Sequence, residues 1–232
     1  AQTNYAHQVL RHVQPAHDAG FLAVISHNEK GLRREMTWPE LRRQVAAMAL
    51  HLQAQGVQPG DRVAAYMPNI PEAMVAFLAT VSLGAVWSIC APDMGTASVL
   101  DRFRQIEPKV LIACDGYYYA GKTIALGGKI ANVARELNAV TTIVVIDYTG
   151  EASADDEQVQ RRLSLRWCGL RRRRPRESRG HGFVMHGCTL PRLGPAESRR
   201  CRSRRRCILE APEKSPLSGL QRGSIDAFDV VR

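Results

Sequence analysis

Residues 115–122 read Asp-Gly-Tyr-Tyr-Tyr-Ala-Gly-Lys, and they combine residue types that can hold a phosphate. Alanine and glycine are small, so the backbone at Ala120 and Gly121 can approach a phosphate group closely. Lys122 supplies a positive charge directly beside this pair. A segment of this kind can therefore accommodate a phosphorylated ligand. A surface loop whose lysine is merely solvated is the alternative, and both interpretations stay open at this point.

Other residues with polar or aromatic side chains fit structural roles better. Trp87 and Phe103 are predicted to belong to the core, and Asp61 and Arg62 are predicted to order a turn. The histidines and cysteines of the last third lack the closely paired spacing of zinc modules, so we predict no metal site. These residues are His181, His186, Cys188, Cys201 and Cys207.

A short buried strand at 63–67 is central to the elements that must position the 115–122 segment. Pro59-Gly60-Asp61 has the composition of a turn, because proline pre-sets its φ angle and glycine adopts conformations that other residues avoid. The strand is an unbroken apolar run, which is typical of a strand covered on both faces. Pro71 follows where a helix can begin, since the first helical N–H needs no partner.

Strands and helices alternate along the first 150 residues. This order predicts an α/β fold with a parallel, doubly wound sheet. Strands are expected at 21–26, 33–36, 85–90, 109–114 and 142–147. Helices are expected at 5–13, at 71–83 and at 99–106, the last with Ser98 and Asp101 near its cap. Another helix is expected to begin after Thr37 as its cap and to end at Gly56. The apolar spacing of Leu126, Ile130, Val133 and Leu137 predicts a further helix.

Several stretches resemble the acyl-CoA synthetases of the adenylate-forming superfamily, and within it most closely the acetoacetyl-CoA synthetases. The resemblance covers residues 4–148 and then stops. It implies that this part is the first portion of a large N-terminal domain, with an incomplete doubly wound sheet. The stretches that carry it are 56–73, Leu83-Gly84-Ala85-Val86-Trp87-Ser88, 101–103, 105–111 and 115–117.

The resemblance implies an acid–thiol ligase that acts in two half-reactions. ATP, with Mg²⁺, and acetoacetate would give an acyl-adenylate, which coenzyme A would attack to give acetoacetyl-CoA, AMP and diphosphate. Ligases for acetate, propionate or another short acid remain alternatives, because the acyl-pocket residues lie mostly beyond this stretch. Carried over position by position, Tyr119, Ala120, Gly121 and Lys122 would face the nucleotide end of coenzyme A. The family usually has arginine where this chain has Tyr118.

Two parts that adenylation requires in the family have no counterpart in the sequence. One is a Ser/Thr/Gly-rich loop followed by lysine, which holds the phosphates of ATP. The other is a lysine-bearing C-terminal lid domain. We therefore expect the chain to bind no ATP, to contain no catalytic residues and to be inactive by itself.

Charge divides the chain into two regions. Residues 1–160 carry 13 Lys and Arg against 16 Asp and Glu, whereas residues 161–232 carry 19 against 6. The second region shows no apolar periodicity and cannot bury enough apolar surface to offset its ordering entropy. We expect a partial N-terminal domain at 1–160 and a disordered Arg-rich tail at 161–232. A nucleic-acid-associated protein is the alternative from another class, although no aromatic residues interleave with the arginines and no specific nucleic acid is predicted.

The Arg-rich region also has the pattern of a frameshifted reading of the same gene. Residues 194–198 can be encoded so that a one-base shift spells Gly-Leu-Pro-Lys-Ala, the end of the family's phosphate loop. The same shift can turn 204–206 into Gly-Gly-Gly and 210–216 into Lys-His-Leu-Lys-Ser-His-Arg. Since the matches fall in one frame and in order, we expect this region to be frameshift-derived. A true basic tail is the alternative.

The composition also bears on the compartment. No stretch approaches the roughly 20 apolar residues of a membrane helix, and the start lacks the pattern of a secretory signal. The six cysteines form no close C-x-x-C pair, and Cys90 and Cys114 fall in predicted strands as small apolar residues. The sequence therefore predicts a cytoplasmic protein with no membrane partner. It does not define the oligomeric state.

Overall fold

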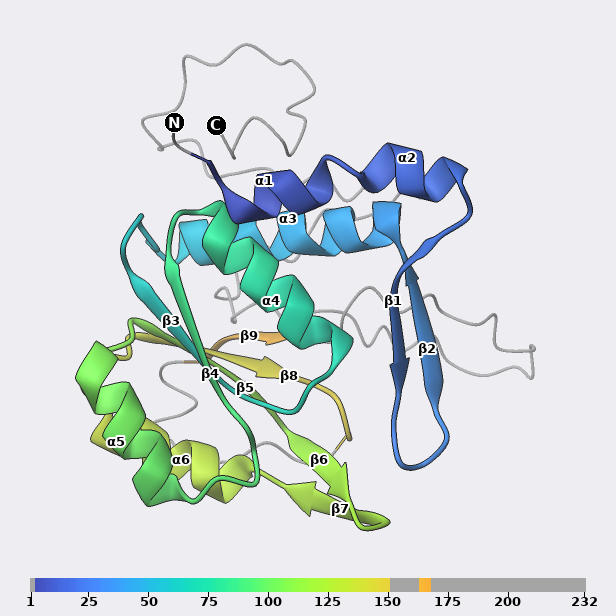
Figure 1. Cartoon of the computed structure of the whole chain (residues 1–232). Coiled ribbons are helices and arrows are strands. Elements are labelled where there is room, and N and C mark those ends of the chain that lie inside the picture. The colour runs from blue at the N-terminus through green and yellow to red at the C-terminus, as the bar shows by residue number, and fades with distance from the viewer. Residues whose placement is uncertain (1–2, 151–162, 168–232) are drawn as a thin grey trace, which may run out of the picture.

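The computed structural model describes residues 3–150 and 163–167, and all structural statements refer to these residues. Figure 1 shows a twisted sheet between two groups of helices, with two small hairpins beside it. The predicted disorder of the Arg-rich tail falls outside the described residues, apart from the five at 163–167. The five histidines and cysteines weighed as metal ligands also lie outside them.

A five-stranded parallel sheet forms the centre of the described structure. Its strand order is β4-β3-β5-β8-β9, and every neighbouring pair is parallel. The predicted parallel sheet is therefore confirmed. The strands are β3 Arg62–Tyr66, β4 Val86–Cys90, β5 Val110–Cys114, β8 Thr142–Ile146 and β9 Leu163–Trp167.

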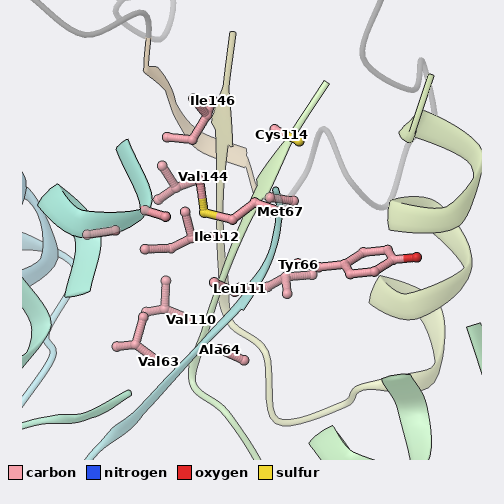
Figure 2. Packing of buried hydrophobic residues seen from close by; sticks show 14 of the residues in the cluster. Val63, Ala64, Tyr66, Met67, Val110, Leu111, Ile112, Cys114, Val144 and Ile146 are labelled. Carbon is pink, nitrogen blue, oxygen red and sulfur yellow. The ribbon is translucent and has the colours of Figure 1, made fainter. Parts of the chain in front are cut away.

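The central strands are buried along their whole length. Every residue of β5 and β8 is buried, as expected for parallel strands covered on both faces. Side chains leave the strands on alternate sides, so Val63, Ile112 and Val144 gather on one face while the Tyr66 ring points to the other (Figure 2). Both faces are therefore apolar and need helices to cover them.

Helices cover both faces of the sheet, which makes the fold doubly wound. Helices α3 and α4 contact each other on one face, and α5 and α6 contact each other on the opposite face (Figure 1). Helices α1 and α2 lie further out, against α4 and α3. The bounds are α1 Tyr5–Leu10, α2 Val13–Asp18, α3 Trp38–Ala54, α4 Pro71–Ser82, α5 Thr96–Ile106 and α6 Gly127–Glu136.

Most of the predicted helix ends are confirmed. The Thr37 side chain accepts a hydrogen bond from the Glu40 N–H at 3.4 Å, and Gly56 ends the same helix region with a φ of 79°. The cap predicted for α5 is wrong: the helix begins at Thr96, and no side chain caps its first N–H groups. The single helix expected at 5–13 is instead the pair α1 and α2, separated by residues 11–12.

Strand β9 lies beyond the predicted boundary at residue 160. Leu163–Trp167 pairs in parallel with β8, so the ordered sheet continues into the region that was predicted to be disordered. Its sequence, Leu-Ser-Leu-Arg-Trp, alternates apolar and polar residues as a strand does. Sequence analysis overlooked this short alternation because arginines surround it.

Candidate functional site

The candidate phosphate-binding segment is a β-hairpin. Strand β6 (Gly116–Tyr119) pairs antiparallel with β7 (Lys122–Ala125), and Tyr119 lies opposite Lys122. Ala120 and Gly121 form the two-residue turn with φ angles of 49° and 74°. Two successive positive φ angles define the tight type I′ turn, in which glycine is favoured. The four predicted contact residues therefore form the tip of one hairpin.

The hairpin lies where an open α/β sheet usually binds ligands. The chain passes from β3 through α4 to β4 on one side of β3, and then through α5 to β5 on the other side. Strands β3 and β5 are thus separated by the topological switch point of the sheet. The hairpin follows directly after the carboxyl end of β5, at the edge where ligands of such sheets bind.

Asp115 fixes the base of the hairpin. Its fully buried carboxylate accepts hydrogen bonds from the backbone N–H groups of Tyr148, Thr149 and Gly150, at 2.9, 3.0 and 2.7 Å. Gly116 follows where no side chain fits, because an added Cβ would lie 2.7 Å from the Ile124 carbonyl oxygen. These contacts join the chain after β8 to the start of β6.

One face of the hairpin is held by the turn between β1 (Leu22–His27) and β2 (Arg33–Thr37). The Lys30 ammonium donates to the Thr123 hydroxyl at 2.9 Å and lies 4.5 Å from the centre of the Tyr118 ring. The Tyr118 ring meets Tyr148 edge-on at 5.3 Å. A pocket of about 280 Å³ opens beside these rings and is also lined by residues 27–29 and 68–70.

A carboxylate already contacts the hairpin tip. The Gly121 N–H donates to Glu29 Oε2 at 3.1 Å, and Glu29 belongs to the same turn as Lys30. The turn is itself anchored through β2, where Arg34 donates to both carboxylate oxygens of Glu72 at 2.6 and 3.1 Å. A phosphate at the Gly121 amide would therefore compete with Glu29.

The opposite face of the hairpin carries the groups that meet solvent. Cross-strand partners project on the same side, so Tyr119 and Lys122 lie together and Tyr118 lies on the other side. Tyr119 is 62% exposed, and the side chain of Lys122 is exposed as well. Tyr117 shares their side but is buried, and burial together with the negative charge of Asp93 raises the pKa of its phenol. The tip thus presents the Lys122 ammonium group and the Tyr119 ring to solvent, where a ligand could contact them.

Tyr66 and Lys129 hold the loop that follows β4 near this face. The Tyr66 hydroxyl donates to the carbonyls of Pro92 and Met94 at 3.1 and 2.8 Å, and the Lys129 ammonium donates to Pro92 at 3.1 Å. Burial raises the pKa of Tyr66 to about 12, so its hydroxyl stays a donor. Sequence analysis missed this loop support, as it missed Glu29 and Lys30, because the partners lie far apart in sequence.

Residues predicted to be structural have structural contacts. Asp61 Oδ2 accepts from the Gln58 N–H and from the Lys109 ammonium, both at 2.9 Å, and the Gln58 bond is the main reason that the pKa of Asp61 is lowered. Arg62 donates to the carbonyls of Ile106 and Glu107 at the end of α5. The predicted turn-ordering role is therefore confirmed for Asp61, whereas Arg62 supports the end of α5 instead.

The aromatic and thiol groups also follow the prediction. Phe103 is fully buried, and Trp87 is half-buried against Phe77 at a ring distance of 6.2 Å. Cys90 and Cys114 are free, buried thiols in strands. Burial raises the pKa of Cys114 to about 12. No group of metal-binding side chains occurs within residues 3–150 and 163–167.

The class of protein follows from the fold together with a match to a known family. The chain has a doubly wound sheet with a hairpin at its switch point. Its residues 12–181 match the model of the AMP-binding enzyme family. The chain therefore belongs to this family. The match extends past residue 160 and, like β9, places the end of the family-like region later than the sequence analysis did.

Several of the similar proteins are acetoacetyl-CoA synthetases. The enzyme of Rhizobium meliloti (strain 1021) is 44% identical over 154 residues, covering 66% of this chain and 23% of that protein. The solved structure of the enzyme from Streptomyces lividans is 46% identical with a TM-score of 0.62, again covering 66% and 23%. A malonamoyl-CoA synthetase of Penicillium aethiopicum is 37% identical over 147 residues, covering 63% and 20%.

This chain spans less than a quarter of the length of the relatives that it matches. The resemblance to acyl-CoA synthetases and the α/β fold with a parallel sheet are both confirmed for the matched part. Among the helices of the described residues, none combines the length and the apolar character that crossing a membrane requires.

Proposed function

We propose that this chain is the N-terminal part of an acetoacetate–CoA ligase. The whole enzyme joins acetoacetate to coenzyme A through an acetoacetyl-adenylate, with consumption of ATP in the presence of Mg²⁺ and release of AMP and diphosphate. The observation that carries the proposal is the identity of 44% and 46% to two acetoacetyl-CoA synthetases over the same share of the chain. Buried, unpaired thiols at Cys90 and Cys114 support a reducing, cytoplasmic location.

The hairpin tip is the proposed contact for the nucleotide end of coenzyme A. Tyr119, Ala120, Gly121 and Lys122 are exposed, lie at the ligand side of the sheet, and combine an ammonium group with an aromatic ring. Phosphates of coenzyme A would approach Lys122, and its adenine could stack on Tyr119. No bond is made or broken here, so these residues bind and orient the ligand.

The 232-residue chain by itself is proposed to form no adenylate. Its sequence contains no Ser/Thr/Gly-rich loop followed by lysine that could hold the phosphates of ATP. Hydrogen-bond donors that stabilise the charge developing in the transition state lower the barrier of such reactions by several kcal/mol. We therefore expect no measurable adenylate formation by a chain that lacks them.

The similar proteins are named for different acyl groups. The same part of the chain matches acetoacetyl-CoA synthetases at 38% and 44% identity and a malonamoyl-CoA synthetase at 37%. This favours a ligase for another short acid as the second candidate, because the matched quarter is shared by enzymes named for different acyl groups.

Titration with coenzyme A tests the proposed contact. We expect Lys122→Ala to weaken coenzyme A binding about tenfold, since a charge-assisted hydrogen bond contributes about 1.5–3 kcal/mol. Arg43→Ala removes an equal charge from the exposed side of α3 and is expected to leave binding unchanged. Equal weakening in both variants, or none in either, would count against the hairpin. Binding to DNA would instead fall steeply with salt and be insensitive to Lys122.

The Arg-rich region is proposed to derive from a frameshift of the ligase gene. Its support is the excess of positive charge after residue 160 and the ordered codon matches at 194–198, 204–206 and 210–216. Because β9 is part of the sheet, the shift is expected after Trp167. The coding DNA decides: third bases that prevent the shifted frame from spelling these stretches would leave a true basic tail.

A further inference from the structure

The Gly121 N–H at the tip of the β6–β7 hairpin is held by a side chain from another turn. Tyr119 pairs with Lys122 across the two-residue turn, so the Gly121 N–H takes no part in the pairing of β6 with β7. It donates instead to Glu29 Oε2 at 3.1 Å, from a position 92 residues away in the sequence. The amide that a phosphate would approach is therefore occupied by a carboxylate.

The Glu29 carboxylate has little else to hold it in this position. Glu29 and Gly121 are both exposed, and within residues 3–150 and 163–167 the carboxylate has no ion pair and no second hydrogen-bond partner. Such a contact contributes little net free energy, because water competes for both groups. A phosphate carries more negative charge and three strong acceptor oxygens, so it can displace the carboxylate.

The turn that carries Glu29 stays attached to the hairpin through other contacts. The neighbouring Lys30 donates to the Thr123 hydroxyl at 2.9 Å and lies over an aromatic ring of β6. Asn28 Oδ1 accepts from the backbone N–H groups of Lys30 and Leu32, both at 3.0 Å, which fixes the shape of the turn itself. Glu29 can therefore leave the tip by rotation of its side chain, without separation of the two hairpins.

Space for the displaced side chain lies beside the tip. The pocket of about 280 Å³ is lined by Glu29 itself, together with Asn28, Asn69 and Tyr148 among others. The asparagine amides are potential hydrogen-bond donors to a carboxylate. A Glu29 side chain that turns into this pocket therefore exchanges one polar environment for another.

We infer that Glu29 sets the affinity of the hairpin tip for coenzyme A, by competing with a phosphate of the ligand for the Gly121 N–H. The inference rests on the proposed function of the hairpin as the coenzyme A contact. Only the state in which Glu29 has turned away offers the amide to the ligand. A competing group that holds a site for about four-fifths of the time lowers the apparent affinity about fivefold. Glu29 is thus an affinity-determining residue and not a contact of the ligand.

A different role for Glu29 would be to support the turn. Ala120 has a positive φ of 49°, which is unfavourable for a residue with a Cβ, and the bond from Gly121 to Glu29 could stabilise this conformation. Removal of the carboxylate would then weaken coenzyme A binding. Removal of a competitor strengthens it, so the sign of the effect separates the two roles.

Calorimetric titration of variants with coenzyme A measures this sign. We expect Glu29→Ala to tighten binding about fivefold and Glu29→Gln about threefold, since glutamine keeps an acceptor but loses the charge. Glu35→Gln is the control, because it removes an equal charge from an exposed residue of the adjoining strand β2 and should leave the affinity unchanged. Weaker or unchanged binding by Glu29→Ala would overturn the inference. So would equal tightening by Glu35→Gln, which would indicate a general effect of charge.

Solvent exchange of the Gly121 amide, followed by NMR, tests the competition directly. Glu29→Ala should speed this exchange about fivefold in the free chain, and coenzyme A should slow it again, because a phosphate replaces the carboxylate as acceptor. If Lys122→Ala weakens coenzyme A binding but coenzyme A leaves the Gly121 exchange of Glu29→Ala unchanged, the inference alone fails. If Lys122→Ala leaves binding unchanged, the proposed function of the hairpin fails and the inference fails with it.

Discussion

The β6–β7 hairpin follows a central strand of the parallel sheet, and β4 forms one edge of that sheet. The hydrogen-bonding groups and side chains of these two regions are satisfied to different degrees. The hairpin base is tied by the three hydrogen bonds of Asp115, and its Tyr118 face contacts the β1–β2 turn through Lys30. At the β4 edge, Val86 and Ile89 are about half exposed and one side of the strand lacks a neighbour among the described residues. Within the described residues, the hairpin is therefore held by several contacts, whereas β4 is an edge with one neighbour.

This difference separates two requirements of the enzyme. The groups proposed to meet coenzyme A are positioned by contacts between segments of this chain, some about 90 residues apart. Strand β4, in contrast, has only β3 as a neighbour among the described strands. Ligand contact at the hairpin is therefore expected without the rest of the fold, whereas full stability and the adenylation step are not.

The largest expected effect is a complete absence of the first half-reaction. The purified chain should show no acetoacetate-dependent exchange of diphosphate into ATP, because its sequence lacks the phosphate-holding loop. The intact Streptomyces lividans enzyme serves as the positive control. Exchange above a blank without protein would contradict this prediction, since it would mean that a catalytic site exists outside the hairpin region.

The next effect compares one residue from each region. Asp115→Ala should lower the free energy of unfolding by about 3 kcal/mol, because the backbone N–H groups of three residues lose a buried charged acceptor. Ile89→Ala should cost less than about 1 kcal/mol, since much of the Ile89 side chain is in solvent. Urea denaturation of both variants measures the difference. Similar costs would show that the two regions are equally packed.

The sequence was sufficient for the elements whose pattern is local. The buried run at β3, the Thr37 cap and the apolar spacing from Leu126 to Leu137 each depend on neighbours within a few residues, and they predicted the parallel sheet correctly. The hairpin at 115–122 was recognised only as a candidate loop. Its turn depends on the unusual positive φ of Ala120, which the residue type does not indicate.

The long-range partners of the site could not be predicted in the same way. Glu29 and Lys30 reach the hairpin only because two separate hairpins lie beside each other at one end of the sheet (Figure 1). Strand β9 had a readable alternation, but it was outweighed by the charge around it. Contacts of this kind follow from topology, so they become visible once the strand order is known.

A smaller effect uses the two buried thiols as reporters of the two regions. Burial raises the pKa of Cys114, in the central strand β5, to about 12, and also raises that of Cys90, in β4. A raised folded-state pKa means that the thiol contributes stability below its unfolded pKa of about 8.5, and that this contribution is lost as pH rises toward the folded value. Between pH 9 and 11 the chain should lose stability, by up to about 1.4 kcal/mol per pH unit from Cys114.

Substitution of each cysteine isolates its share of this alkaline loss. Cys114→Ala should flatten the dependence of unfolding free energy on pH above 9 more than Cys90→Ala does, because β5 is covered on both faces and β4 is an edge. Urea denaturation at pH 8, 9 and 10 gives the slopes. An equal change of slope for the two variants would indicate that the β4 edge is as well shielded from solvent as the centre of the sheet.

The smallest effect is expected at the amino ends of β3 and β5, which both regions share. Asp61 accepts from the Gln58 N–H and from Lys109, and these contacts hold the pKa of its carboxyl below the ordinary value of about 3.9. A lowered folded-state pKa stabilises the fold above the unfolded value, and this stability is lost as pH falls through the folded one. Asp61→Asn should therefore lower the free energy of unfolding at pH 7 by less than about 1 kcal/mol, because the ion pair is partly exposed.

The acid side of the same measurement decides whether this interpretation is correct. As pH falls toward 2 and through the lowered pKa of Asp61, its carboxyl gains a proton in the folded state as well, so the difference between Asp61→Asn and the unmodified chain should shrink. Asp101→Asn, on the exposed side of α5, is the control and should change stability little at either pH. If the loss of unfolding free energy caused by Asp61→Asn stayed constant from pH 7 to pH 2, Asp61 would act through the shape and hydrogen bonds of its side chain and not through its charge. A deficit of several kcal/mol would mean that the turn before β3, and not the hairpin base, is the most strongly stabilised point of the sheet.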